Sequence, residues 1–316
     1  MNFIFGPVPS RRLGLSLGIN IVPFKTCSYN CIYCEVGKTT HLSVERRRFY
    51  DPHLIESEFI GVLETAGRFD YVTFSGSGEP TLNSDLGDLI RFVKSQVECK
   101  VCVLTNGSLM FREDVRAELA AADLIIPSLD AARAVTFKRI NMPHPSLDIQ
   151  KIIDGIAAFS EENPDKVWLE VLFVKGVNHA KEDLDALIDA IKKIKPLKVQ
   201  IGTVDRPPAY TNARRLSDSE MMDVYLYLSA HLENVELIGR FNANNRAFKD
   251  NVERSIIKII NIRPCSREEL SEIFSIDPNE LDEILKRLFR EKKAFEVQFG
   301  SKLFIAGNRS AAGLPG

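Results

Sequence analysis

Three cysteines, Cys27, Cys31 and Cys34, lie within eight residues near the start of the chain. Thiols so close in sequence can bind one corner of a metal site. A structural zinc ion needs four ligands, and His41 is the nearby candidate for the fourth. A cubic iron–sulfur cluster normally takes four thiolates, so three would leave one iron open to a substrate or cofactor. The third interpretation, unrelated core cysteines, is not favoured by a loop that also contains Asn30 and Lys38.

The other three cysteines show no such clustering. Cys102 and Cys265 lie in apolar surroundings and are predicted to be core residues. Cys99 and Cys102 are three residues apart at the start of a predicted strand, so their side chains are expected on opposite faces. No second metal site is predicted from them.

The three clustered cysteines follow the first of six predicted strands, which alternate with helices. The strands are 14–23, 69–75, 100–105, 124–129, 167–174 and 198–204, and the helices between and after them are 51–66, 84–97, 112–122, 148–160, 182–194 and 217–232. Strands separated by helix-length connections form a parallel sheet. Turn residues follow the strands at Gly76, Asn106, Gly107, Asp130 and Gly176, on the edge where α/β barrels carry their chemistry. Ser217 and Glu220 predict a capping box at the last of these helices.

The C-terminal part has a different pattern. An Asn-rich stretch (Asn242, Asn244, Asn245 and Asn251) is predicted to be a linker. Helices are expected at 253–262, 266–274 and 278–292, with Ser266 and Asp277 as N-caps, and strands at 294–299 and 302–306. Three helices followed by a hairpin predict a winged helix. The expected domains are therefore 1–245, a partial barrel, and 250–308, a winged helix-turn-helix domain.

Bulk properties exclude several classes of protein. The 316 residues are 45% hydrophobic and 27% charged, with a formal net charge of −2, which gives no general attraction to nucleic acid or anionic membrane. No stretch approaches 18 apolar residues, and the N-terminus lacks the layout of a signal peptide. A cytoplasmic location is expected, where cysteines serve as metal ligands more often than as disulfides. The tail from Ser310 is expected to be disordered.

The cysteine run resembles the radical S-adenosylmethionine (SAM) superfamily, whose hallmark is C-x3-C-x2-C with an aromatic residue before the last cysteine. Tyr33 fills that place. The resemblance implies a partial (β/α)6 TIM-like barrel, a [4Fe–4S] cluster held by the three cysteines, and SAM bound at the open iron. It also implies reductive cleavage of SAM to a 5′-deoxyadenosyl radical that modifies a substrate, with a low-potential electron donor as a partner. The substrate (an RNA base, a peptide or a metabolite) and the catalytic residues are not identified.

Further segments extend the resemblance to the SAM site. Gly76, Ser77, Gly78 and Glu79 match the family's Gly-Gly-Glu element, with Ser77 in the place of its first glycine. By resemblance this element meets the amino group of SAM, and an ordinary glycine turn is the alternative. The other implied SAM contacts end later strands: Asn106, Ser128, Asp130, and Ile201 with Gly202 beneath the adenine. Asn106 is also a typical turn residue, and 200–204 also fits a plain last strand. Glu170, within an apolar strand, is predicted to face the barrel interior, with an outward, solvent-facing position as the alternative.

Segments 6–12, 37–39 and 206–208 resemble the branch that contains the wyosine-forming tRNA enzymes. Those enzymes hold a second cluster with cysteines that precede the radical SAM triplet. Residues 1–26 of this chain contain no cysteine, so the branch activity does not follow from the resemblance.

The predicted winged helix suggests a macromolecular partner. Acidic residues occupy the start of its third helix (Asp277, Glu280, Asp282 and Glu283), and basic residues occupy its end (Lys286, Arg287, Arg290, Lys292 and Lys293). Acids at the helix start oppose binding to phosphates, although they also suit the helix dipole. A protein or RNA partner is therefore expected ahead of duplex DNA. The alternative function is an iron–sulfur redox sensor that regulates by binding nucleic acid, which would not need the SAM-binding residues.

Overall fold

A computed structural model gives the fold and describes residues 3–10, 12–238, 252–262, 264–274, 276–300 and 302–308. Arg11, the predicted Asn-rich linker and the predicted disordered tail lie outside these residues. Among the described residues, no helix combines the length and the apolar character needed to cross a membrane.

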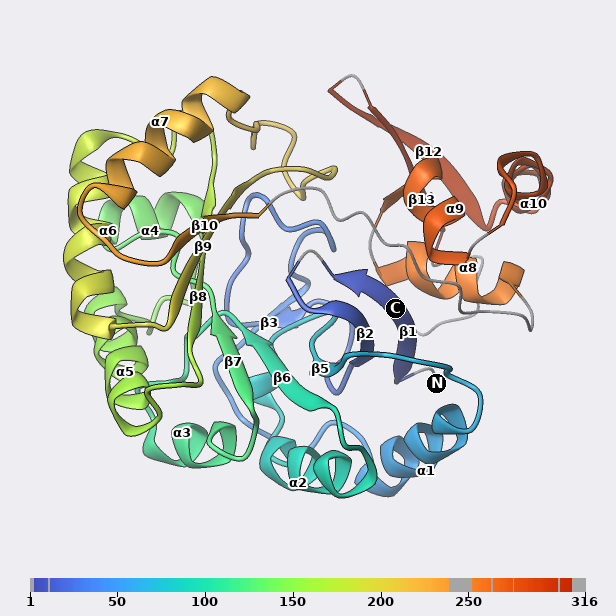
Figure 1. The fold of residues 1–316 in the computed structure, drawn as a ribbon, viewed down its shortest axis with the longest axis horizontal. Helices are drawn as coiled ribbons and strands as arrows, with labels where there is room; N and C mark the ends of the chain where they lie inside the picture. The colour runs from blue at the N-terminus through green and yellow to red at the C-terminus, as the bar shows by residue number, and fades with distance from the viewer. Residues whose placement is uncertain are drawn as a thin grey trace.

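A curved α/β sheet lies at the centre of the larger part of the molecule (Figure 1). Its strands, in spatial order, are β1 (Ile4–Ser10), β2 (Gly14–Ile19), β5 (Tyr71–Phe74), β6 (Lys100–Thr105), β7 (Leu124–Pro127), β8 (Trp168–Phe173), β9 (Lys198–Thr203) and β10 (Val235–Leu237). Bridges from Ile125 to Val167 and from Ser128 to Glu170 join β7 to β8. All neighbours from β2 to β10 are parallel, and β1 is antiparallel to β2. The six predicted strands are confirmed, and β1 and β10 extend the sheet at its two edges.

Helices cover the outer face of this sheet (Figure 1). They are α1 (Pro52–Leu63), α2 (Leu86–Gln96), α3 (Glu113–Leu119), α4 (Ala134–Ile140), α5 (Ile149–Glu162), α6 (Lys181–Ile194) and α7 (Asp218–Ser229), with a short 3-10 helix, η1, at Pro80–Leu82. The predicted capping box at Ser217 and Glu220 is present. Helix α4 is not among the helices predicted from the sequence. The strand, helix and layer order is that of a partial α/β barrel.

Alternation along the strands divides the buried side chains between two cores. On β6, Val101 and Val103 pack into the main core under the helices, while Cys102 lies in a smaller inner cluster. That inner cluster also contains Leu13, Leu124 and Ile126. Cys99 packs against the main core, so Cys99 and Cys102 point to opposite faces, as predicted. The inner cluster fills part of the barrel interior with apolar side chains.

The C-terminal segment (residues 252–308) has a hydrophobic core of its own. It contains α8 (Val252–Ile262), β11 (Cys265–Ser266), α9 (Arg267–Phe274), α10 (Pro278–Arg290), β12 (Ala294–Phe299) and β13 (Lys302–Gly307). The three helices and the hairpin lie where the sequence predicts them, and β11 pairs with β13. Cys265 is fully buried in this core. Asp277 caps α10 by accepting a hydrogen bond from Asn279 N at 2.8 Å.

Candidate active site

The loop that carries the three cysteines, residues 25–40, is called the cluster loop here. It includes β3 (Thr26–Cys27), which pairs with β4 (His41–Leu42). The cluster loop runs beside the last residue of α4 and the residues that follow it. Ile32 N donates to Ile140 O at 2.9 Å, and His144 N donates to Ser28 O at 2.9 Å. Backbone hydrogen bonds therefore fix the path of the loop between its cysteines.

Each cysteine sulfur accepts a hydrogen bond from a side-chain N–H group. Lys25 Nζ lies 3.1 Å from Cys34 Sγ. Asn106 Nδ2 lies 3.5 Å from Cys27 Sγ, and Asn141 Nδ2 lies 3.4 Å from Cys31 Sγ. Donors of this kind stabilise sulfur that carries negative charge, as in a metal-bound thiolate.

The protein environment itself does not favour free thiolates at Cys27 and Cys31. Burial raises the pKa of Cys27 to about 12, and the nearby Glu79 carboxylate adds to the increase. Burial, followed by the charge of Asp130, raises the pKa of Cys31 well above its usual range. These thiols would lose their protons only to a strongly binding metal group. The donors at the sulfurs and the burial of Cys27 and Cys31 both fit a metal cluster in this place.

A zinc site with His41 as fourth ligand is not assembled. His41 is exposed on β4. In the described part of the chain, no three His, Cys, Asp or Glu side chains converge closely enough to hold a single metal ion. An iron–sulfur cubane is larger than one ion and spaces its thiolate ligands more widely, so this finding does not count against a cluster at the three cysteines.

The Gly76–Glu79 element follows β5 and packs against the cluster loop. A Cβ at Gly78 would lie 2.0 Å from the carbonyl oxygen of Thr26, so only glycine allows this approach. Ser77 O accepts from Lys25 N at 2.7 Å. Gly76 has a φ of +129°, which glycine adopts most readily. The element therefore shapes the backbone next to Cys27.

The Glu79 carboxylate is buried and holds two strand ends together. It accepts from Thr81 N and Thr81 Oγ1 at 3.0 and 2.7 Å, from Thr105 Oγ1 at 2.6 Å and from Asn106 N at 2.7 Å. Burial raises its pKa, although these hydrogen bonds oppose the increase. The side chain thus joins the ends of β5 and β6 rather than pointing to solvent.

Asp130 is likewise occupied by the protein. One carboxylate oxygen accepts from the Tyr33 hydroxyl and, at 2.7 Å, from Asn141 Nδ2, and the other accepts from Leu172 N at 2.9 Å. Burial raises the pKa of both the Tyr33 hydroxyl and the Asp130 carboxyl. Asp130 therefore orients Tyr33, and it orients Asn141, the residue that donates to Cys31.

The other predicted SAM contacts differ in their accessibility. Asn106 Nδ2 also donates to Ser28 Oγ at 2.8 Å, which ties the end of β6 to the cluster loop. Ser128 is partly exposed, and its hydroxyl makes no hydrogen bond within the described residues. Ile201 has its side chain in the main core and so cannot offer it to a ligand in the barrel. Gly202 is partly exposed beside it.

Glu170 faces the barrel interior, as predicted. Its neighbours Leu169 and Val171 pack into the main core, and Glu170 forms an ion pair with Arg12. Gln200 is the direct partner of Glu170 in the β8–β9 register, and its Oε1 is buried without a hydrogen bond. A row of polar groups therefore lies at the same level of the barrel as Ser128.

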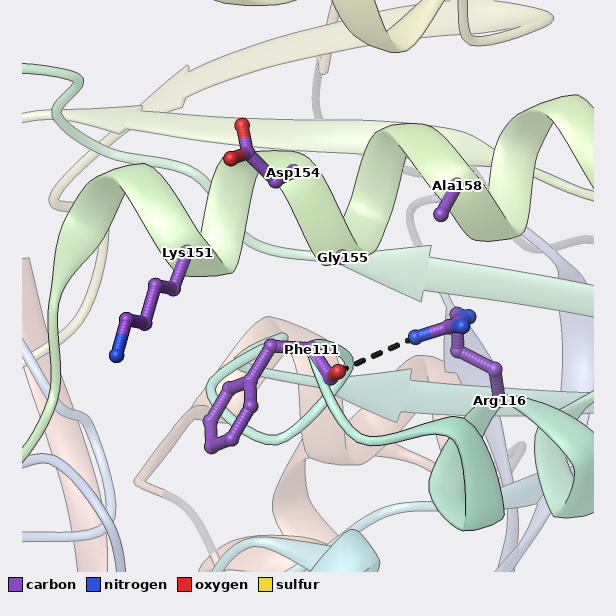
Figure 2. A pocket seen from close by; sticks show the side chains of 6 residues that line it. All are labelled: Phe111, Arg116, Lys151, Asp154, Gly155 and Ala158. Carbon is purple, nitrogen blue, oxygen red and sulfur yellow. Dashed lines mark hydrogen bonds between the residues drawn. The ribbon is translucent and has the colours of Figure 1, made fainter.

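A separate depression of about 310 Å³ lies on the outer layer of the molecule (Figure 2). It is lined by Phe111, Arg116, Lys151, Asp154, Gly155 and Ala158, from α3, α5 and the loop before α3. The backbone of Gly155 packs closely against Met110 and Phe111, and Arg116 Nη1 donates to Phe111 O at 3.3 Å. None of the predicted site residues lines it, so it is a seam between helices.

Two residues that contact the cysteine sulfurs, Lys25 and Asn141, are not predicted from the sequence. Lys25 lies two positions before Cys27, and a lysine so close to the cysteine run was a signal for a sulfur contact. Asn141 follows α4, and its distance of 110 residues from Cys31 leaves no local pattern that points to their hydrogen bond.

Comparisons with known proteins agree with this geometry. The Radical SAM superfamily model matches residues 21–191, more than half of the chain. The UPF0026 protein MJ1312 of Methanocaldococcus jannaschii is 31% identical over 315 residues, covering 98% of this chain and 97% of that protein. A protein named GTPase Obg from Brachyspira hyodysenteriae is 37% identical over 306 residues, which are 96% of this chain but only 45% of that protein.

Among solved structures, a radical SAM methyltransferase from Sphaerobacter thermophilus has a similar fold. Its TM-score is 0.55 at 18% identity, and the match covers 70% of this chain and 65% of that one. The comparisons give no support to the alternative of a redox-sensing regulator. The protein is an enzyme that uses a [4Fe–4S] cluster and SAM, and the chain belongs to the radical SAM superfamily.

Proposed function

We propose that Cys27, Cys31 and Cys34 ligate the cluster of this enzyme and that SAM binds beside it, across the carboxyl ends of β5 to β9. The observation that carries the proposal is that each of the three sulfurs accepts a hydrogen bond from a side-chain N–H group. When bound, the cluster supplies the electron that cleaves SAM to methionine and a 5′-deoxyadenosyl radical. The protein supplies position, hydrogen bonds and exclusion of water.

The residues around the cysteines fall into two groups: those whose polar groups are hydrogen-bonded within the protein, and those whose polar groups are available to SAM, which are called open positions. Glu79 and Asp130 stabilise the site without contacting SAM, because their carboxylates already accept hydrogen bonds from donors of the protein. The backbone of Gly76 and Ser77, the Ser128 hydroxyl and the backbone of Gly202 are the open positions proposed to meet SAM. Ile201 contributes to the same strand through its backbone alone, because its side chain is buried in the main core.

The substrate is proposed to enter the barrel interior and to meet the Glu170–Arg12 pair. The support for this is a polar layer above an apolar inner cluster, with a buried Gln200 oxygen that lacks a partner. A group with both donors and acceptors would satisfy these side chains. Such a group can belong to an RNA base, a peptide or a metabolite.

The C-terminal segment is proposed to be a winged helix, in a two-domain chain divided at about residues 245–250. The order α8, β11, α9, α10, β12, β13 supports this. Ion pairs with acids of the same segment are formed by Lys286 and Arg287, in the last turns of α10, and by Lys293, which follows the helix. These pairs lower the net positive charge around the end of α10, which favours a protein partner over a nucleic acid.

Anaerobic reconstitution tests the proposal. The wild-type protein should hold about four irons per chain and release 5′-deoxyadenosine slowly with dithionite and SAM. Cys31→Ala should lose both properties, whereas Cys99→Ala, a matched change outside the cluster loop, should keep both. A full cluster that survives in Cys27→Ala, Cys31→Ala and Cys34→Ala would contradict the ligand assignment. An intact cluster with bound SAM but no 5′-deoxyadenosine would contradict the chemistry.

A further inference from the structure

The segment that follows β9, residues 204–213, lies against the cluster loop. Tyr210 N donates to Ile32 O at 3.1 Å, and Asn30 Nδ2 donates to the Tyr210 hydroxyl at 2.8 Å. The ammonium of Lys38 lies 4.6 Å from the centre of the Tyr210 ring. Backbone, side-chain and cation–π contacts therefore hold this segment against the cluster loop, and all of them involve loop residues other than the cysteines.

Arg206, in the same segment, connects the cluster loop with the C-terminal segment. Its guanidinium donates from Nη1 to Glu35 Oε2 at 2.9 Å and from Nη2 to Glu269 Oε1 at 2.8 Å. The Arg206 side chain is 10% exposed, so the bridge is largely shielded from solvent. Glu35 directly follows Cys34 in the sequence, and Glu269 lies on α9. A planar guanidinium can hold two carboxylates in fixed directions, which a lysine cannot do.

Glu269 is itself held in place at the start of α9. Its second carboxylate oxygen accepts from Ser266 N at 3.0 Å, and Glu269 N donates to Ser266 Oγ at 3.2 Å. These reciprocal bonds form a capping box, which fixes the Glu269 side chain relative to the helix. The C-terminal end of the bridge is therefore rigid.

Apolar contacts hold the C-terminal segment against the barrel at two further points. Val8 of β1 packs against the core of the C-terminal segment. Phe299, at the tip of the β12–β13 hairpin, packs against the main core of the barrel. On the hairpin, Val297 and Phe299 share one face, and Phe304, opposite Val297, is 3% exposed. The hairpin thus has apolar residues on the face opposite Ala294 and Ile305, which pack on its own helices.

We propose that Arg206 is a positioning residue through which the C-terminal segment holds the Cys34–Glu35 end of the cluster loop. This inference rests on the proposed function, since it takes Cys34 as a cluster ligand. The contacts run from α9 to Glu269, to Arg206, to Glu35 and so to Cys34. The C-terminal segment is then part of the support of the cluster, in addition to any role in binding a partner.

Full-length variants, reconstituted anaerobically, test this role. In Arg206→Gln and in Glu269→Gln, the rate at which a chelator removes iron should rise on the order of tenfold, as for other residues that orient metal ligands. The EPR spectrum of the reduced cluster should broaden or show a second species in both variants. Arg206→Lys should restore the wild-type rate of iron loss and the wild-type EPR spectrum only in part. An ammonium does not have the planar arrangement of N–H donors with which a guanidinium holds two carboxylates. Arg215→Gln, which removes an exposed pair with Asp218, is the matched control and should behave as wild type.

The possible outcomes distinguish a failure of the Arg206 proposal from a failure of the proposed function. A wild-type protein that assembles no cluster contradicts the proposed function itself. A wild-type cluster whose spectrum and iron loss are unchanged in Arg206→Gln, even where the melting temperature falls, overturns the positioning role alone. If Arg206→Gln does not fold, Glu269→Gln tests the positioning role in its place, because that variant keeps the Arg206–Glu35 pair. A wild-type spectrum and wild-type iron loss in Glu269→Gln overturn the proposal.

Discussion

The ammonium of Lys25 donates a hydrogen bond to the sulfur of Cys34, with 3.1 Å between Nζ and Sγ. Lys25 is 3% exposed, and no carboxylate of the described residues forms an ion pair with it. A buried charge needs a partner, and a metal-bound thiolate would provide one. Because a positive donor favours the more negative, reduced state of a cluster, Lys25 is expected to raise the cluster's reduction potential.

Lys25→Met should therefore lower the reduction potential. We expect a change of about 60 mV, the one-electron equivalent of a tenfold change in the equilibrium constant. EPR-monitored redox titration of the reconstituted protein measures it. Lys192→Met, the same change at an exposed position of α6, is the control and should leave the potential unaltered. An unchanged or higher potential in Lys25→Met would contradict the expectation that the Lys25 charge raises the potential of the cluster.

The hydrogen bond between Tyr33 and Asp130 is predicted to stabilise the fold as well as the site. Tyr33→Phe leaves a buried carboxylate with one donor fewer, and the expected loss is about 1–3 kcal/mol in the free energy of unfolding. Urea unfolding of the metal-free protein measures this loss. Tyr227→Phe removes a similar hydroxyl–carboxylate bond to Asp185, but at the surface, and should have a much smaller effect. Equal losses in the two variants would contradict the importance of burial.

Much of the fold could be predicted because strands and helices of this chain alternate with clear periodicity. The edge strand β1 was missed, since Pro7 and Pro9 argue against a strand interior. Proline lacks the amide proton of a sheet ladder and is tolerated where a strand has a free edge, which is the place of β1. Helix α4 is only seven residues long, too short for a periodic pattern to be distinctive.

The site was predicted less completely than the fold. The cysteine spacing and the glycine element are local patterns, and the structure brings the two loops that carry them into contact. The orientation of Glu79 and Asp130 depends on partners from other strands, such as Asn106 and Leu172, that no local pattern reveals. The sequence therefore located these acids at the strand ends but did not show that their carboxylates are turned into the protein.

The Arg12–Glu170 pair is predicted to be a sensitive point of the barrel interior. The two side chains are 13% and 20% exposed, so Glu170→Ala would leave a poorly solvated cation. We expect a loss of about 3–5 kcal/mol in the free energy of unfolding, measured by urea titration. The double variant Arg12→Met/Glu170→Leu should recover most of that loss, because the guanidinium is then removed together with the carboxylate. A double variant as unstable as Glu170→Ala would contradict this explanation.

Gly78 is predicted to be required for the cluster through its lack of a side chain. In Gly78→Ala, the new Cβ would fall 2.0 Å from the carbonyl oxygen of Thr26. Neither atom can move away by a side-chain rotation, because the backbone fixes the position of both. The strand β3 must then move, and Cys27 must move with it. Iron content after reconstitution should fall sharply, and the sulfur of Cys27 should lose its contact with Asn106.

Gly61→Ala separates this effect from a general cost of replacing glycine. Gly61 lies inside α1, where a Cβ meets no atom within 4 Å. This variant should keep its iron and gain about 0.5–1 kcal/mol in the free energy of unfolding, since alanine favours a helix interior. Iron analysis and urea unfolding of both variants give the comparison. A Gly78→Ala protein with a full complement of iron would show that β3 can move without displacing Cys27, and the close approach at Gly78 would then not serve the cluster.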